Sequence, residues 1–379
     1  MLQTDRDLLV CIFQRGAADG LNSVVPYGDN DYYLQRSNIN VPKSTFTAPG
    51  SEFYLDGLFG LHPALAPLKP IYDLGDLALV HATGVPHGSR SHFTAQGLVE
   101  RGVTDKAGPD TGWLGRHMNN SPAASTSAFR MVSISGNVAV SLFGADEPLA
   151  ISNISDFGFD QDVIDSGYLD ILADVYSSTA PFQGPAQAAL AAIGELQAAD
   201  IASFVPENGA VYPAGALGDK LFQASQLIKS NLPVEVICID SDGWDHHENL
   251  PTYINQSLTE LAESLSAFHT DMGASRMQRI TVLVHTEFGR RVAENGSQGV
   301  DHGTGGLAYL MGGGVNGGQV YSSWPGLADA NLEMGEDLKI TTDLRTVLSE
   351  MLSKRFVGAN LADVFPGFSV PPYLGVFDS

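Results

Sequence analysis

Four short apolar runs, each followed by polar residues, constrain the fold of this chain more than any other sequence feature. The runs cover residues 8–13, 77–81, 234–240 and 280–284. Short apolar runs bounded by turn residues are typical of strands that are buried on both faces of a sheet. Between the last two runs, apolar side chains recur at intervals of three and four residues, as expected for one face of a helix. They are Leu258, Leu261, Leu265, Phe268 and Met272.

A strand, a helix and a strand in this order predict an α/β fold with a mostly parallel central sheet. Right-handed crossover connections then place helices on both faces of the sheet. We expect one such domain over residues 1–379, with residues 131–135 as a further strand. Residues 156–230 are richer in Ala, Gln and Leu at helical spacing. We interpret this segment as a helical insertion within the domain and a candidate cap over its pocket.

The charge of the chain excludes several classes of partner. There are 20 Lys+Arg against 43 Asp+Glu, a formal net charge of −23. Nucleic acids and anionic membrane surfaces are bound through basic patches, so we expect neither as a partner. We also expect no membrane span, because no stretch approaches the roughly 20 apolar residues that a spanning helix needs. The first residues, MLQTDRDLLV, lack the basic and apolar regions of an export signal.

The two cysteines indicate buried thiols rather than a disulfide scaffold. Cys11 and Cys238 each lie in one of the apolar runs, so we expect them in neighbouring strands. A glycine motif at Gly312, Gly314 and Gly317 has the spacing of a dinucleotide-binding loop, but the residues after it are not helical. We predict a turn between two strands at that point.

Polar residues that could bind a ligand follow each of the four runs. In parallel sheets, ligands bind at the carboxyl ends of the strands, so these residues should converge on one edge. They are Asp19 after the first run, Ser89, Arg90, Ser91 and His92 after the second, Asp242, Asp245, His246 and His247 after the third, and Glu287 after the fourth, with Asp301 and His302 in a later glycine-rich loop.

The residue types favour a divalent-metal site. Imidazole with carboxylate suits Zn, Mn or Fe, whereas carboxylate alone suits Mg or Ca. Such a metal lowers the pKa of a bound water or hydroxyl and polarises an ester oxygen. A helix predicted to begin near Ser91 would place that side chain where backbone N–H groups favour an anion. Arg90 beside it could bind a phosphate or sulfate group.

Each candidate also has a structural interpretation. Asp19 could be a turn residue or helix cap, Ser91 only an N-cap, and the pair at 246–247 a surface pair. Glu287 could form a plain ion pair with Arg290 or Arg291. His81 and His285, at strand ends, are candidates for a supporting role behind the metal ligands.

A series of ordered motifs resembles a known family. They are RGAADGLN, LHPALAPL, SRSHFTAQ, GWLGR, GWDHHEN, TEFGRR, ENGSQGVDHGTGG and GGGVNGGQVYSSWPGL. Together they resemble the DUF1501 family of uncharacterised bacterial proteins, over about residues 7 to 355. The resemblance implies a fold of the alkaline phosphatase/sulfatase superfamily, with one or two divalent metals at the carboxyl edge of the sheet. It also implies a periplasmic or extracellular location.

The resemblance also suggests roles for single residues. Asp19 resembles the aspartate after the first strand, and His302 the late histidine. Ser91 resembles the nucleophile, with Ser89 as its competitor. Asp245 with His247 matches the family pattern, whereas Asp242 with His246 gives the phosphatase spacing, and both pairs stay open.

The chain departs from the superfamily pattern at Phe288, where a ligand histidine is usual. Phenylalanine cannot bind a metal, so the resemblance implies either a single metal or compensation by His92 or Asp301.

The leading hypothesis is a metal-dependent hydrolase of phosphate or sulfate esters. In it, Ser91 or a metal-bound water is the nucleophile, Arg90 neutralises the oxyanion, and His92 or His87 transfers a proton. The expected cofactor is Zn, Mn, Mg or Ca, and the expected partner is a small or polymeric anionic ester. The alternative is a non-catalytic protein that keeps a vestigial site and binds an anionic polymer or a surface partner. A third hypothesis is another metal-assisted reaction, such as lyase chemistry.

Overall fold

The computed structural model describes residues 7–47, 51–123, 127–157, 167–177 and 183–378. Its centre is a nine-stranded sheet in which eight strands follow the order β10-β4-β9-β8-β1-β7-β5-β6, and β11 also pairs with β4. The strands are β1 (Leu8–Gln14), β4 (Leu77–Gly84), β5 (Met131–Ser133), β6 (Leu149–Ala150), β7 (Val236–Ser241), β8 (Ile280–Thr286), β9 (Gly306–Gly312), β10 (Val320–Tyr321) and β11 (Thr342–Asp343). A small antiparallel pair joins β2 (Val24–Val25) to β3 (Gly60–Leu61).

The pairing is mostly parallel, which confirms the sheet predicted from the apolar runs. β1 lies between β7 and β8 and is parallel to both. The strand β9 is the exception, because it runs antiparallel to both β4 and β8. The amino end of β9 therefore lies beside the carboxyl end of β8. The glycine-rich residues after β9 lead to the short strand β10 and form the predicted turn.

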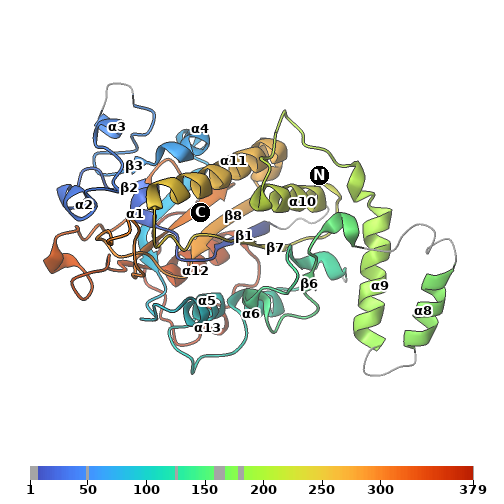
Figure 1. Cartoon of the computed structure of the whole chain (residues 1–379). Helices are drawn as coiled ribbons and strands as arrows, with labels where there is room; N and C mark the ends of the chain where they lie inside the picture. The colour runs from blue at the N-terminus through green and yellow to red at the C-terminus, as the bar shows by residue number, and fades with distance from the viewer. Residues whose placement is uncertain (1–6, 48–50, 124–126, 158–166, 178–182, 379) are drawn as a thin grey trace.

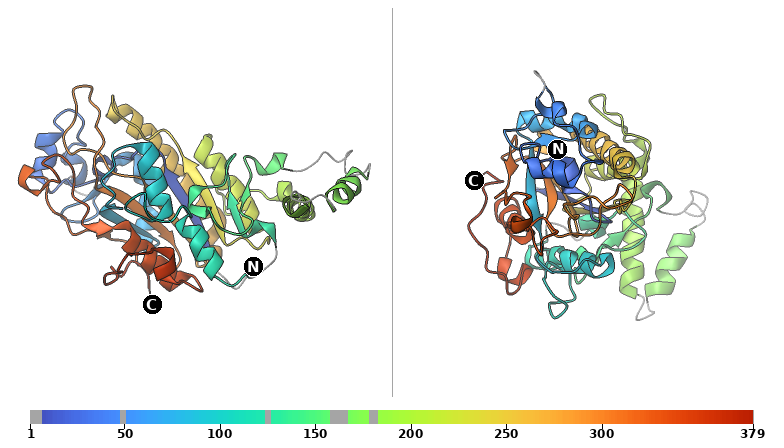
Figure 2. Two further views of the ribbon diagram at one scale, coloured as in Figure 1. Left: turned by 90° about the horizontal axis from the view of Figure 1, so that it is seen from below. Right: turned by 60° about the vertical axis from the view of Figure 1, so that its left-hand side comes forward.

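Helices cover both faces of the sheet (Figure 1; Figure 2). The side chains of β1 alternate between two separate cores, as the geometry of a strand requires. Leu8, Val10 and Ile12 pack in one core with side chains of α10 (Ala216–Lys229) and α11 (Leu250–Met277). Leu9, Cys11 and Phe13 pack in the other core with α5 (His92–Arg101), α6 (Trp113–Asn120) and α12 (Leu344–Arg355). The five residues of the predicted apolar stripe, Leu258 to Met272, are all buried on α11.

The remaining helices of the described residues are mostly short, and α1 among them is entirely buried. They are α1 (Gly20–Ser23), α2 (Asn30–Gln35), α3 (Ser44–Thr47), α4 (Lys69–Leu74), α8 (Tyr168–Ser177), α9 (Gln183–Ala198) and α13 (Leu361–Val364), with the 3-10 helices η1 (Pro63–Leu68), η2 (Ala128–Arg130), η3 (Val140–Leu142), η4 (Ile154–Asp156), η5 (Ile201–Ser203) and η6 (Asp329–Asn331).

The described part of the segment 156–230 contains α8, α9, η5 and α10, with irregular residues at 204–215, and its role as a cap stays a prediction. The helices α8 and α9 project from the side of the molecule (Figure 1). Helix α9 packs against η2, which directly precedes β5, and thus contacts the amino end of that strand. Because β5 runs parallel to β7 and β1, this is the edge opposite the carboxyl ends of the strands. Among the described helices of this segment, α10 contacts β7, and Ala192 and Leu196 of α9 belong to the same core as the β1 side chains.

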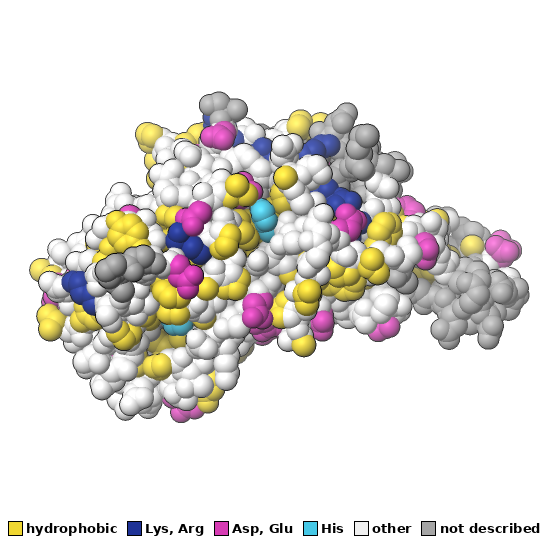
Figure 3. Space-filling view, turned by 90° about the horizontal axis from the view of Figure 1, so that it is seen from above, with side chains coloured by type: hydrophobic (Ala, Val, Ile, Leu, Met, Phe, Trp, Pro, Cys, Tyr) yellow, Lys and Arg dark blue, Asp and Glu magenta, His cyan; other side chains and the backbone are white. Residues whose placement is uncertain are grey.

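The cysteines and the surface agree with the sequence. Cys11 and Cys238 are buried register partners on the neighbouring strands β1 and β7, as predicted. Acidic side chains are scattered over the face seen in Figure 3, with apolar and uncharged ones between them. Nowhere in the described chain does a helix have both the length and the apolar character of a membrane span.

Candidate metal centre

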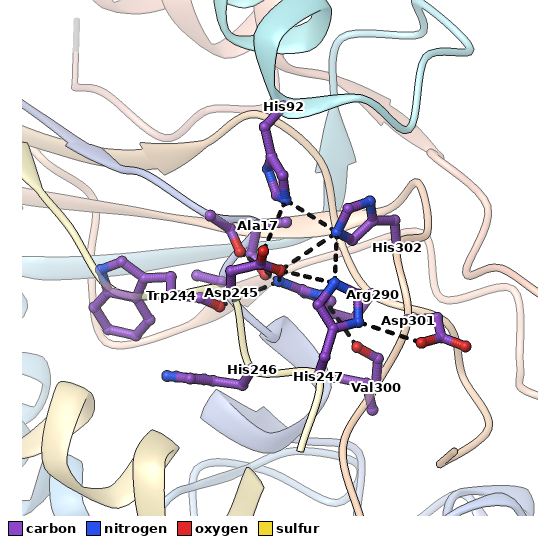
Figure 4. Close-up of polar contacts among 12 residues, drawn as sticks. Ala17, His92, Trp244, Asp245, His246, His247, Arg290, Val300, Asp301 and His302 are labelled. Carbon is purple, nitrogen blue, oxygen red and sulfur yellow. Dashed lines mark hydrogen bonds and ion pairs between the residues drawn. The ribbon is translucent and has the colours of Figure 1, made fainter. Parts of the chain in front are cut away.

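Four chain segments meet at the carboxyl edge of the sheet and form the candidate metal centre (Figure 4). The loop after β7 carries Asp245 and His247, and β8 leads directly into Glu287. Helix α5, which begins after β4, places His92 in its first position. His302 precedes β9 and reaches the same edge because β9 is antiparallel to β8. Of the residues expected at this edge, the structure brings His92, Asp245, His247, Glu287, Asp301 and His302 together.

Three side chains form the middle of the centre. His92, Asp245 and His302 each offer one ligand atom, and these atoms lie within 4.8 Å of one another. The Nε2 atoms of His92 and His302 are 2.9 Å apart. Asp245 Oδ2 is 3.4 Å from His92 Nε2, and Asp245 Oδ1 is 3.3 Å from His302 Nε2.

His247 extends this group on the other side of His302. Its Nε2 atom is 2.9 Å from His302 Nε2 and 3.0 Å from Asp245 Oδ1. Metal–ligand distances of about 2.0–2.1 Å give ligand separations of about 2.9 Å in an octahedron and about 3.3 Å in a tetrahedron. The separations within the centre therefore match the edges of a coordination polyhedron.

The outer nitrogen of each histidine has an acceptor as its partner. His92 Nδ1 lies 2.8 Å from Glu287 Oε1, and His247 Nδ1 lies 3.3 Å from Asp301 Oδ1. His302 Nδ1 lies 2.7 Å from the backbone carbonyl oxygen of Arg90. Carboxylate and carbonyl oxygens accept hydrogen bonds, so each Nδ1 is the protonated donor. In the neutral tautomers, all three Nε2 atoms then direct a lone pair into the centre.

This arrangement fits a metal ion. Unprotonated nitrogens 2.9 Å apart repel each other, and one proton on His302 Nε2 could satisfy only one of its two histidine neighbours. Burial also lowers the pKa of His302, which disfavours that proton. A histidine that binds a metal through Nε2 and donates its Nδ1 proton to a carboxylate or carbonyl is the usual arrangement in metalloproteins. His92, Asp245 and His302 are the residues that would hold the ion, and His247 lies next to them.

Glu287 supports His92 rather than facing the centre directly. Its side chain is 1% exposed, and Oε1 accepts hydrogen bonds from Gly16 N, His92 Nδ1 and Gln96 Nε2 at 2.8–3.0 Å. Thr286 Oγ1 donates to Oε2. Although burial alone would raise the pKa of Glu287, these hydrogen bonds lower it to about 2. The carboxylate is thus ionised at neutral pH, and it raises the pKa of His92.

Arg290 lies beneath the centre and was not predicted to contact it. Its buried guanidinium donates to the carbonyl oxygens of Ala17 and Val300 and to Asp245 Oδ1, the last at 2.6 Å. Burial opposes ionisation of Asp245, but Arg290 lowers the pKa of this carboxyl to about 2. The alternative interpretation of Glu287 as the ion-pair partner of Arg290 or Arg291 does not hold, because Arg290 pairs with Asp245 and Arg291 pairs with Glu336.

The structure separates the two Asp/His pairs that the sequence left open. Asp245 and His247 lie in the centre, whereas His246 turns away from it (Figure 4). His246 is buried, and its Nε2 lies 3.4 Å from Ser257 Oγ. Asp242 is exposed and lines a neighbouring cavity. Backbone hydrogen bonds from His246 N to Trp244 O and from His247 N to Asp245 O turn the chain at this point, and the two imidazoles lie in different directions (Figure 4).

Asp19 is placed elsewhere, as a structural residue. Both of its carboxylate oxygens bind the guanidinium of Arg36, and it caps α1 through Asn22 N. Asp19 and Arg36 are both buried. With its oxygens used in this way, Asp19 does not act as the metal ligand that the sequence suggested.

Several of the side chains just before α5 are already engaged in hydrogen bonds or ion pairs. Ser91 is exposed, and its side chain makes no capping bond to the helix. Ser89 Oγ instead accepts from Ser91 N at 3.2 Å. Arg90 is paired with the buried carboxylate of Asp337. His87 uses both ring nitrogens in backbone contacts, with Ser89 N and with Glu287 O, so it has no nitrogen left for proton transfer.

Phe288 occupies the place of the expected histidine and packs against the ligands. Its ring lies 5.0 Å from the ring of His92 and 5.1 Å from that of His302, measured between centroids. Phe288 is 3% exposed, so it forms an apolar wall behind the two imidazoles. The sequence also missed Gln96, although its i, i+4 spacing from His92 places both on one face of a helix. His81 and His285 are buried within the sheet, outside the set of converging ligand atoms.

The fold and the centre together define an α/β protein with a candidate divalent-metal site at the carboxyl edge of its sheet. The chain belongs to the DUF1501 family, described as a protein of unknown function, whose family model matches residues 78–352. No curated protein matches the chain. A solved structure of a 2-O GAG sulfatase is 12% identical with a TM-score of 0.27, and the match covers 83% of this chain and 66% of that one. The alkaline phosphatase-like fold therefore stays a prediction.

Proposed function

We propose that this protein is a metal-dependent hydrolase of phosphate or sulfate esters. The observation that carries the proposal is the convergence of His92, Asp245 and His302, whose ligand atoms lie within 4.8 Å of one another. His247 lies beside this group, and an acceptor at Nδ1 orients each imidazole. A mixed nitrogen and oxygen ligand set favours Zn or Mn over Mg or Ca. When bound, such a metal supplies Lewis-acid polarisation of the ester oxygen and a lower pKa for an attacking hydroxyl or water.

The charges around the centre support a divalent cation. Asp245, Glu287 and Asp301 contribute three negative charges, and Arg290 contributes one positive charge, which leaves −2. An anionic ester would be repelled by this charge. Because Asp337 already neutralises Arg90, a bound cation is the source of positive charge that remains for the substrate.

Ser91 is the proposed nucleophile. It directly precedes His92 and lies at the amino end of α5, where backbone N–H groups favour a developing negative charge. Its hydroxyl is exposed and is not used in capping. Ser89 is less suited to attack, because its hydroxyl oxygen accepts a bond from the backbone of Ser91.

Metal content and turnover test the proposal together. We expect the purified protein to bind Zn or Mn, and we expect His302→Ala and Asp245→Asn to lose the metal. The matched control is His269→Gln, because His269 pairs with a carboxylate, Asp76, outside the centre. Ser91→Ala should keep the metal and lose phosphate or sulfate release from a panel of aryl esters. Equal metal content in His302→Ala and the parent protein would overturn the proposal.

A non-catalytic metal-binding protein is the second candidate. The ion pair between Arg90 and Asp337 favours it, because that pair withdraws the arginine expected to bind the substrate anion. Two results together would support this candidate over the hydrolase. The protein would bind a stoichiometric amount of metal without turnover, and Ser91→Ala would have no effect on ligand binding.

A further inference from the structure

A cavity of about 550 Å³ lies beside the metal centre, at the same edge of the sheet. Its volume is within the range of about 300–1,000 Å³ that is usual for small-molecule sites. Residues following β1 and β7 line it, together with one side of α5 and the loop after β5. The charged and aromatic residues among them, with the amide that also contacts the centre, are Arg15, Phe93, Gln96, Glu100, Asp240 and Asp242.

The cavity and the metal centre share helix α5. Gln96 lines the cavity and donates to Glu287 Oε1 at 3.0 Å, and Glu287 in turn orients His92. Phe93, which also lines the cavity, directly follows His92 in the chain. The cavity is therefore joined to the metal centre through α5 and through the contacts of Gln96 and Glu287 with His92.

The charge of the cavity is acidic. Arg15 is its one lining cation, and that guanidinium is already paired with Glu100 and Asp240, each at 2.7 Å. The nearby ammonium of Lys220 is bound to the backbone carbonyl oxygen of Asp240 at 2.6 Å. Asp242 has no hydrogen bond or ion pair within the described residues. A second anionic group on a ligand would find no unpaired cationic side chain among the residues that the structure describes around this cavity. A neutral or cationic group would find carboxylate oxygens that accept hydrogen bonds.

Phe93 provides a flat apolar surface at this cavity. It is 95% exposed, the largest exposure among the large hydrophobic side chains described. Gly97 lies one turn further along α5 and also lines the cavity, and a Cβ atom there would meet nothing within 4 Å. Exposed aromatic rings bind other rings by stacking and bind cations through the face of the ring.

We propose that this cavity binds the alcohol part of the ester, and that this alcohol carries a ring and is neutral or cationic. This inference rests on the proposed hydrolase function. Hydrolysis transfers the phosphoryl or sulfuryl group from the alcohol oxygen to water, and the alcohol leaves with the proton that the water loses. The single anionic group of the substrate lies at the metal, and the remainder lies against Phe93 and near Asp242.

A charge series of one ring alcohol tests the inference without requiring turnover. The probes are 4-(aminomethyl)benzyl alcohol, benzyl alcohol and 4-(hydroxymethyl)benzoate, titrated against the whole protein by NMR. We expect the cation to bind most tightly and the anion most weakly. Phe93→Ala should weaken the cationic and neutral probes by about fivefold, and Asp242→Asn should reduce the cation-to-anion ratio by about fivefold. Leu34→Ala, at a well-exposed apolar residue, is the matched control for Phe93.

The outcomes separate this inference from the proposed function. If His302→Ala loses metal but keeps the affinities for all three probes, the cavity is an independent subsite, as proposed. A protein without metal or turnover that still ranks the probes in this order would overturn the hydrolase and keep the cavity. Three outcomes would overturn the inference. The cationic and anionic probes could bind with equal affinity, no probe could bind at millimolar concentration, or the affinities could be unchanged in both the Phe93 and the Asp242 variants.

Discussion

Replacing Glu287 by Gln should weaken metal binding while leaving the fold intact. The Gln oxygen can accept the three bonds now made to Oε1, from Gly16, His92 and Gln96. Thr286 can adapt, because its hydroxyl also has Gln14 O within 2.9 Å as an acceptor. The lost element is the negative charge behind His92. Loss of such an outer partner typically reduces metal affinity by 10–100-fold, or about 1.4–2.7 kcal/mol.

The same substitution should change how stability depends on pH. Folding lowers the pKa of Glu287 from 4.5 to about 2, which corresponds to about 3 kcal/mol of stability. Because the folded-state pKa is depressed, this stability is present above about pH 4.5 and is lost as the pH falls towards 2. The metal-free Gln variant should therefore be less stable than the parent by up to about 3 kcal/mol at pH 7. The difference should shrink between pH 5 and pH 2.

Two assays and one control measure these effects. Chelator competition gives the metal affinity at pH 7, and urea unfolding of the metal-free proteins gives the stability at each pH. Glu350→Gln is the matched control, because Glu350 is also fully buried but accepts only backbone N–H groups, from Leu374 and Phe377. Parent-like metal affinity in the Glu287 variant, or a loss as large in the Glu350 variant, would refute the argument that Glu287 orients His92.

Three further predictions concern the charges around the centre. Arg290→Met should cost about 1–3 kcal/mol of stability in urea unfolding, because it leaves the buried carbonyl oxygens of Ala17 and Val300 without their donor. A cost below about 0.5 kcal/mol would contradict this. Asp19→Asn should keep the metal-to-protein ratio of the parent protein. It should lower the melting temperature, because Arg36 becomes a buried cation without its counter-ion. Loss of metal in this variant would show that Asp19 is a metal ligand. Metal affinity, measured by chelator competition, should fall as the pH drops below about 6.5, because protons compete with the metal for the imidazoles. Protonation of His92 should begin at a higher pH, since its pKa is raised. An affinity that is constant from pH 8 to pH 5 would exclude histidine ligands.

The sequence predicted the sheet and its reactive edge because both depend on local patterns. Apolar runs define buried strands, and parallel strands bring their carboxyl ends together whatever the details of their packing. His92, Asp245, His247 and His302 all came from this argument. The same local reasoning explains the agreement on α11, whose apolar stripe is a property of a single helix.

Local sequence patterns could not tell which of several nearby candidate residues belongs to the site, because that depends on contacts with distant parts of the chain. Asp19 follows β1 as a ligand would, but Arg36 occupies its carboxylate, and no motif marks Arg36 as its partner. Arg290 lies within the TEFGRR motif, yet it pairs across the centre with Asp245 rather than with Glu287. The spacing of apolar residues in α8 and α9 predicts helices but does not tell where those helices lie in the fold. Their position at the opposite edge of the sheet could therefore not be predicted.

The distance along the chain between the ligands has a consequence for folding. His92 and His302 are 210 residues apart in sequence, yet their Nε2 atoms are 2.9 Å apart in the structure. Closing so long a loop is entropically costly, and contacts of this kind usually form late in folding. Partly folded chains would therefore lack the centre, and a metal ion bound there would require β4, β7, β8 and β9 all to be in place. Bound metal would thus slow local opening of this edge and protect it from proteolysis.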